Sequence, residues 1–177
     1  MMPEHPVDRQ AIADGMERAR ATLACLVEEA GDADFDRPSN GTRWTNEQLL
    51  FHMVFGFMVV QRLLPLVRLF GRLPPEWSRK YARLLNLGTP LFDIVNYRGS
   101  SAAAMVYNRR RMVRKFDRVL AALQRELAAE PEHNFDLSMA FPTRWDPFFA
   151  GTMTLEQVYR YPIEHFDYHA RQLTLPA

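Results

Sequence analysis

The sequence predicts an all-α protein, an up-down-down-up four-helix bundle with a long helical crossover between its second and third helices. Apolar residues recur at three- and four-residue intervals in four segments, whereas few segments alternate with a period of two. Two threonines are each followed three residues later by a glutamine, Thr45 by Gln48 and Thr154 by Gln157, and such capping boxes begin helices. About 30 residues separate the second helix from the third, which is enough chain to traverse a bundle and start again at the same end.

Length and composition restrict the class of protein. The 177 residues suit one domain, and we expect a single domain over residues 1–177. A content of 47% hydrophobic and 24% charged residues is typical of a globular protein. The net charge of +1 provides no overall field for nucleic acid or for an anionic membrane, so both partners are disfavoured. A single cysteine and the lack of a signal sequence favour a cytoplasmic location.

The first helix is expected over residues 7–30, where Gly31 is placed to end it. Cys25 falls on the side opposite the apolar stripe, which predicts a solvated or interface thiol rather than a catalytic one. The stripe consists of Ile12, Met16, Ala19, Leu23, Leu26 and Ala30.

The second helix is expected to begin at Thr45 and to continue to about Phe70, with Pro65 kinking or breaking it. It is apolar nearly all round, so it must be covered on more than one side. Charged residues such as Arg62 and Arg68 interrupt the apolar run, and we expect no membrane span. The excess apolar surface predicts a homodimer, with part of this helix or the crossover in the interface.

Three further elements complete the expected fold. A short amphipathic helix at about residues 75–85 lies within the crossover, and an irregular loop precedes the last helix. The third long helix is expected over residues 101–129, and its basic run "RRRMVRK" is interpreted as a solvated face. The fourth helix starts at Thr154 and ends near Leu173. The inward positions of the third helix are Met105, Met112, Phe116, Val119, Leu120 and Leu123.

The pentapeptide "HFDYH" places His165 and His169 four residues apart on the fourth helix. At about 100° per residue, His169 lies on the apolar face of that helix and His165 at its edge. Buried imidazoles need partners for their ring nitrogens, and a metal ion is one such partner. The apolar face also contains Leu155, Val158, Tyr159, Pro162, Phe166 and Leu173.

A third histidine, His52, stands near the start of the second helix, while His165 and His169 stand near the end of the fourth. If these helices are antiparallel, the three imidazoles meet at one end of the bundle. Gly56, one turn beyond His52, then either leaves room for an ion or allows close helix packing. Three neutral imidazoles suit Zn²⁺, Ni²⁺ or Fe²⁺ and leave coordination positions open for water or substrate.

No other polar residue of these segments is assigned a catalytic or metal-binding role. The zinc-protease motif HExxH is absent, because Phe166 occupies the position of its glutamate. Glu164 and Asp167 point outward on the helical wheel, so neither is assigned as a general base, and the catalytic residues stay unknown. His5 and His133 are interpreted as solvated surface groups.

Two motifs resemble the DinB and YfiT-like superfamily. The stretch "WTNEQLLFHM" is similar to the Trp-containing helix start of that family, and "MTLEQVYRYPIEHFDYHARQL" is similar to its HxxxH helix with a trailing "RQL". The resemblance implies an up-down-down-up bundle that holds a divalent metal by His52, His165 and His169. It further implies chemistry like that of thiol-dependent S-transferases and isomerases, which use bacillithiol, mycothiol or glutathione, or of metal-dependent hydrolases. With two lysines among 22 basic residues, the composition is that of a GC-rich genome, which favours mycothiol.

Two functions of different classes follow. The first is a metal-dependent enzyme that activates a low-molecular-weight thiol or water against a small-molecule substrate. Its substrate contacts are expected near the start of the third helix, at Tyr97, Arg98, Tyr107 and Asn108. The alternative is a non-enzymatic helical bundle that binds a small ligand or a protein partner.

Overall fold

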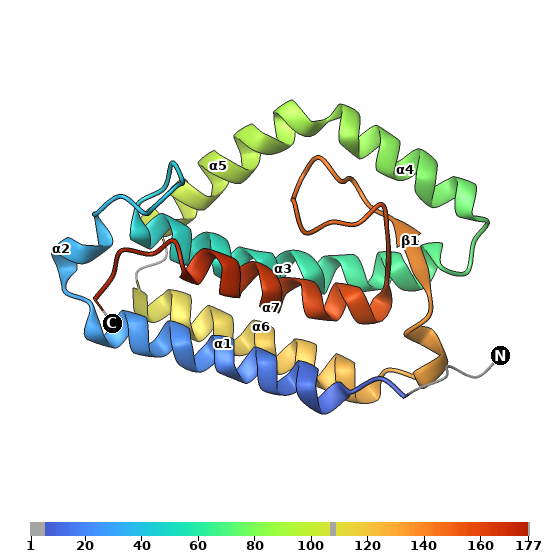
Figure 1. Cartoon of the computed structure of the whole chain (residues 1–177), viewed down its shortest axis with the longest axis horizontal. Coiled ribbons are helices and arrows are strands. Elements are labelled where there is room, and N and C mark those ends of the chain that lie inside the picture. The colour runs from blue at the N-terminus through green and yellow to red at the C-terminus, as the bar shows by residue number, and fades with distance from the viewer. Residues whose placement is uncertain (1–5, 107–108, 177) are drawn as a thin grey trace.

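Four long helices lie alongside one another (Figure 1). They are α1 (Arg9–Glu29), α3 (Asn46–Phe70), α6 (Arg109–Ala129) and α7 (Leu155–Ala170). The computed structural model describes residues 6–106 and 109–176, without the side chains of residues 95 and 103–106. Helices α3 and α1 each pack against both α6 and α7. The colours of Figure 1 show α3 and α6 running in one direction and α1 and α7 in the other, so the end of α7 lies beside the start of α3.

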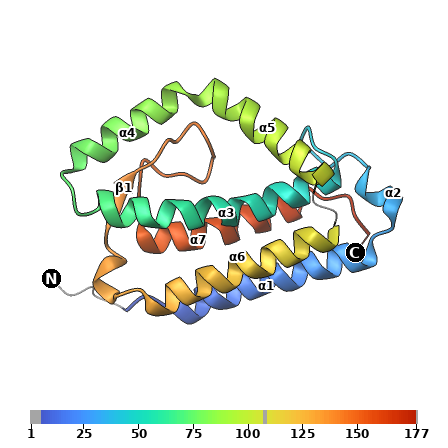
Figure 2. The same cartoon turned by 180° about the vertical axis from the view of Figure 1, so that it is seen from behind.

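The connection between α3 and α6 is helical along most of its length. Helices α4 (Pro75–Leu87) and α5 (Thr89–Val106) form an arch over α3 (Figure 2). The expected helix at 75–85 is therefore confirmed, but the expected start of the third long helix at residue 101 is wrong, because residues 101–106 continue a helix that begins at Thr89. Pro90 is tolerated because it lies in the first helical turn, where its missing N–H has no intrahelical partner to lose.

Helix α3 runs without interruption from Asn46 to Phe70, so the predicted break at Pro65 does not occur. Pro65 lies on the exposed side of the helix, where its ring meets no packed neighbour of the core. This helix is long and apolar enough to span a membrane by length and composition, but 56% of its most apolar window is buried inside the molecule. Its contacts with α5, α6 and α7 are those of a core helix.

The segment before α7, expected to be irregular, contains regular elements. A 3-10 turn, η1 (Glu132–Asn134), precedes β1 (Ser138–Ala140), which pairs antiparallel with β2 (Thr152–Thr154). Strands of three residues are too short to give a detectable period of two, which is why the sequence did not indicate them. The loop between the strands, residues 141–151, is held against α4 because Trp145 Nε1 donates a hydrogen bond to the Leu85 carbonyl (3.0 Å).

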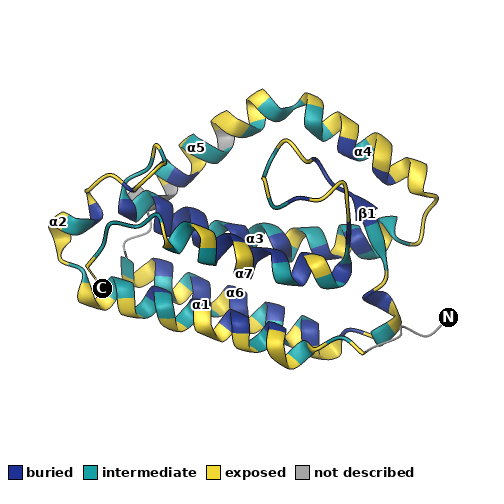
Figure 3. Cartoon of the chain, in the orientation of Figure 1, coloured by how far each residue is buried: buried dark blue, intermediate teal, exposed yellow. Residues whose placement is uncertain are grey.

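The core lies where the four long helices face one another (Figure 3). Most residues predicted to face inward on α1, α6 and α7 are buried, whereas Met105 lies outside the described side chains and Leu26 and Leu173 are partly buried. Cys25 is exposed, as expected. The largest fully buried side chains include Tyr159, Phe35, Phe57, Phe116, Phe135 and Phe166.

Both predicted capping boxes are present. Thr45 Oγ1 accepts from the Gln48 N–H (3.4 Å) and Gln48 Oε1 accepts from the Thr45 N–H (3.2 Å); the corresponding distances between Thr154 and Gln157 are 3.2 and 2.9 Å. A short helix, α2 (Asp32–Phe35), precedes α3. The buried Asn46 side chain joins α2 and α3 to the C-terminal segment, since its amide donates to the Asp34 carbonyl (2.8 Å) and to Thr174 Oγ1 (2.9 Å). The start of α3 and the end of α7 are thereby held together.

Candidate functional site

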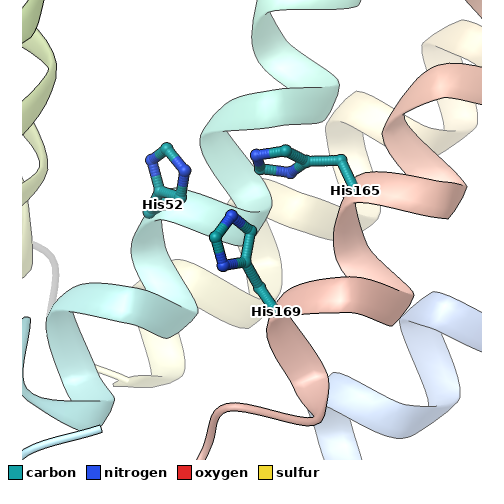
Figure 4. Close-up of side chains that lie close together, drawn as sticks. All are labelled: His52, His165 and His169. Carbon is teal, nitrogen blue, oxygen red and sulfur yellow. The ribbon is translucent and has the colours of Figure 1, made fainter. Parts of the chain in front are cut away.

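Three histidines from two antiparallel helices converge at this end of the bundle (Figure 4). His52 comes from α3, and His165 and His169 come from successive turns of α7. The ring centroids of His52 lie 4.9 Å from those of both other histidines, and those of His165 and His169 are 4.5 Å apart. One nitrogen atom of each ring lies within 4.8 Å of the other two. The buried apolar faces of both helices turn toward the core, and the imidazoles lie on the sides of the helices that face each other.

Burial keeps the three imidazoles neutral. It lowers the pKa of His52 to about 3; the nearby His169 ring acts in the same direction, and a hydrogen bond with the Asn96 side chain opposes both. Burial likewise lowers the pKa of His165 well below its usual value and, to a lesser extent, that of His169. His165 is 2% exposed and His169 is only partly buried, so the residue expected at the edge of the helix is the deeper of the two. Neutral imidazoles present lone pairs, which metal coordination requires.

Hydrogen-bond partners engage some ring nitrogens and leave others free. His169 Nδ1 lies 2.6 Å from Gln172 Oε1, and a proton on Nδ1 leaves the lone pair on Nε2. His165 Nε2 lies 3.5 Å from Oδ2 of Asp146. Within the described part of the chain, Nδ1 of His52 and Nδ1 of His165 are buried without any hydrogen-bond partner. Buried nitrogens without partners are unfavourable, and a bound cation would remove that penalty.

Two neighbours on the α3 side shape the cluster. The indole of Trp44 stacks on the His52 ring with centroids 4.4 Å apart and an interplanar angle of 25°. Gly56 lies against His165, because a Cβ at position 56 would be 3.0 Å from His165 Nδ1. The glycine therefore lets the His165 ring of α7 approach the α3 backbone closely.

The donor set fits a divalent ion. Zn–N bonds of about 2.0–2.1 Å in a tetrahedral site place ligand nitrogens about 3.4 Å apart. In the structure the three ligand nitrogens lie within 4.8 Å of one another. Small side-chain rotations would bring them to the spacing of a tetrahedral site. Among the described residues, no cysteine or carboxylate joins the three histidines in this group. Three nitrogen ligands without a fourth protein ligand are typical of sites that keep a position open for water or substrate.

A cavity of about 140 Å³ adjoins the cluster, and His52 and His165 are among its lining residues. Its other walls come from α3, from the α4–α5 arch and from the loop 141–151. Asp146 lines it as well, where its carboxylate accepts hydrogen bonds from the Tyr161 hydroxyl (2.8 Å) and the Phe148 N–H (2.8 Å). Burial raises the pKa of Asp146 despite these hydrogen bonds.

The expected substrate contacts differ from those observed. Tyr97 is partly buried against Trp44, with ring centroids 6.2 Å apart, and Arg98 is exposed; neither lines the cavity. Tyr107 and Asn108 lie outside the described residues. The sequence assigned no role to Asn96, which does line the cavity.

The two acidic residues next to the histidines in the sequence, Glu164 and Asp167, lie away from the cluster. Glu164 is exposed and Asp167 accepts a hydrogen bond from Arg18 of α1 (3.1 Å), in keeping with the outward orientation expected for both. His133 is exposed, whereas His5 lies outside the described residues. Sequence spacing could not reveal Asp146, because it stands on a loop 19 residues before His165 and reaches it only through the fold. Its only local signal is its place in "RWDPFF", an aromatic-rich loop next to proline.

Comparison with known proteins identifies one family. The sequence model of the DinB superfamily matches residues 16–173 of the chain. No curated protein and no solved structure gives a significant match. The matched range begins within α1 and includes all three histidines.

Proposed function

The chain belongs to the DinB superfamily, and from this premise we propose that it is a divalent-metal-dependent enzyme built on an up-down-down-up four-helix bundle. Its metal ligands are His52, His165 and His169, and its chemistry is thiol S-transfer, isomerisation or hydrolysis. The observation that supports this proposal most strongly is the convergence of three neutral imidazoles, two of which, those of His52 and His165, line a cavity large enough for a small molecule. Zn²⁺, Ni²⁺ and Fe²⁺ all suit such a donor set.

A divalent ion bound there would lower the pKa of a thiol or a water molecule and so make it a nucleophile at neutral pH. The side chains around the cluster orient the metal ligands. Gln172 fixes the ring of His169, and the Asp146 carboxylate faces the ring of His165, the arrangement by which outer groups align metal ligands. Asp146 is also the only carboxylate among the described residues that line the cavity, and we assign it as the acceptor of the proton that the nucleophile releases.

Metal content tests the proposal. We expect untagged protein to contain about one equivalent of divalent metal by elemental analysis, and His52→Ala, His165→Ala and His169→Ala variants to lose it. His133→Ala is the matched control, because His133 is an exposed histidine far along the chain from the cluster. Metal-free wild-type protein that takes up no Zn²⁺, Ni²⁺ or Fe²⁺ in solution would instead favour the non-enzymatic bundle.

A second experiment identifies the reaction class. The metal-loaded protein is assayed against electrophiles with mycothiol, bacillithiol or glutathione, and against esters and amides with water as the nucleophile. Turnover that depends on one thiol and disappears in His52→Ala assigns a transferase, whereas thiol-independent turnover assigns a hydrolase. Because mycothiol is the thiol that the arginine-rich composition favours, we expect it to support the fastest reaction.

A further inference from the structure

The cavity beside the histidines has a size and lining that restrict what it can bind. Its volume of about 140 Å³ is close to that of the apolar cavity of about 150 Å³ that binds benzene in an engineered protein. One six-membered ring therefore fills it. His52 and His165 are among its lining residues, so a bound ring would lie next to the candidate metal position.

The walls are aromatic and aliphatic on several sides. Phe92 of α5 and Trp145 of the loop stack with centroids 4.0 Å apart and an interplanar angle of 7°. The rings of Phe149 and Tyr161 pack against each other with centroids 4.7 Å apart. Helix α3 adds aliphatic side chains, Val59 among them. Such walls favour planar apolar groups, which gain from stacking as well as from leaving water.

The charges around the cavity exclude one class of ligand. The chain has 22 lysine and arginine residues, yet none of them is among the described residues that line this cavity. The single formally charged side chain in the lining is Asp146. In the metal-free protein an anionic ligand would lose its hydration, meet no basic lining residue and lie near a carboxylate, all of which disfavour binding.

One polar group at the cavity has spare hydrogen-bonding capacity. Apart from its interaction with His52, the buried side-chain oxygen of Asn96 has no hydrogen-bond partner in the described part of the chain, and Asn96 lines the cavity together with the two histidines. A polar substituent on the ligand would satisfy this amide, since an unpaired buried polar atom is unfavourable. The ligand therefore combines an apolar ring with one uncharged hydrogen-bonding group.

We propose that this cavity is the binding site for the electrophilic substrate, and that the substrate is an uncharged molecule with a single aromatic ring and one polar substituent. This inference rests on the proposed function in assigning the ligand as substrate, but the binding preference itself needs no metal. It comes from the volume, from the stacked Phe92–Trp145 pair and from the lack of basic lining residues.

The test compares two probes of the same shape, neutral 4-fluorobenzyl alcohol and anionic 4-fluorobenzoate. Their binding to metal-free and to Zn²⁺-loaded protein is followed by fluorine NMR line broadening. We expect the metal-free protein to bind the alcohol saturably with a millimolar or tighter dissociation constant, and to bind the benzoate at least about tenfold more weakly, which corresponds to about 1.4 kcal/mol.

A cavity-filling variant locates the binding site. Val59→Trp should abolish binding of the alcohol, whereas Met58→Trp, one residue away on α3 and outside this cavity, should retain it. Circular dichroism of both variants confirms that they are folded. Equal affinity for the two probes, or the lack of saturable binding of the alcohol to wild-type protein, overturns the inference whatever the metal content. Failure of the proposed function would appear separately, as protein that binds the alcohol but takes up no metal.

Discussion

Gly56 of α3 lies so close to the ring of His165 that a Cβ at position 56 would be 3.0 Å from Nδ1 and 3.4 Å from Cε1 of that histidine. Contacts of this length between a Cβ and a ring are tight, so an alanine here must displace the imidazole. Glycine in a helix interior is otherwise unfavourable by about 1 kcal/mol relative to alanine. The histidine cluster therefore requires a residue that the helix alone would not favour.

Gly56→Ala should consequently weaken metal binding by about tenfold or more, while the metal-free protein gains up to about 1 kcal/mol from helix propensity, less any strain. Affinity is measured by competition with a chelator and stability by urea unfolding. Gly99→Ala is the matched control, since a Cβ at Gly99 in α5 would meet nothing within 4 Å. Unchanged metal affinity in Gly56→Ala would show that the contact has no role in the site.

The metal-free protein should lose stability as the pH falls below about 6.5. The folded-state pKa of His52, about 3, lies below the ordinary value, so the unfolded chain takes up a proton that the folded protein does not. The slope is up to about 1.4 kcal/mol per pH unit for each such histidine, and the loss stops where the folded-state pKa is reached. Urea unfolding between about pH 5.5 and 7.5 measures it, and His52→Gln should show a shallower dependence than His133→Gln. If the unfolding free energy depends on pH equally in both variants, His52 is not a source of the pH dependence.

Removal of the metal should leave the protein folded and inactive. The core between the four long helices consists of apolar side chains such as Leu49, Phe57 and Phe116, and none of these depends on the histidines. Structural zinc dominates folding mainly in domains too small to build such a core. Circular dichroism before and after chelation checks the expectation, with activity restored by added metal. A wholesale loss of helicity would mean that the metal is structural.

A partly buried ionic network at the opposite end of α3 should contribute to stability. Arg68 Nε donates to Glu130 Oε2 (2.9 Å), and the Arg68 guanidinium also reaches Glu126 and the Tyr159 hydroxyl. Burial alone would raise the pKa of Glu130, but hydrogen bonds from Arg68 and Asn134 outweigh it and lower that pKa. Arg68→Ala leaves Glu130 buried without a cation and should destabilise the fold by about 3 kcal/mol.

Urea unfolding at neutral pH measures this loss of stability. Arg125→Ala on α6 removes an exposed arginine from the same region and should change the unfolding free energy by less than about 0.5 kcal/mol. If the Arg68→Ala variant is no less stable than the Arg125→Ala variant, the ionic network makes no net contribution to the free energy of unfolding.

The homodimer expected from the sequence stays a prediction, and the arch is where we place its interface. Five of the large exposed apolar side chains lie on α4 and α5, and within each helix they are three or seven residues apart, as on one face of that helix. They are Trp77, Leu84, Leu87, Leu91 and Ile94. A second copy offers the same apolar face, which suits a two-fold symmetric interface.

Light scattering should therefore give twice the mass of one chain. Leu84→Glu should give a monomer, and Ala121→Glu, at an exposed position of α6, should not. A wild-type monomer at high protein concentration would exclude this dimer.

The helices and the three histidines could be predicted from the sequence because their signals are local. Capping boxes at Thr45 and Thr154 determine where α3 and α7 begin, and helical periodicity then determines which side chains point inward. The extension of α5 to Val106 was not predictable, because the alanine-rich residues 101–106 suit the end of one helix as well as the start of another.

Only the tertiary structure decided what surrounds the histidines. Asp146 and Asn96 reach the cavity from a loop and from the arch, and no spacing in the sequence relates either of them to His165. The burial that makes the imidazoles neutral, and the lack of basic residues in the cavity, likewise depend on how the arch and the loop 141–151 pack over α3. Periodicity reports on residues within one or two turns of a helix, whereas a binding cavity is made by segments that meet only after the chain has folded.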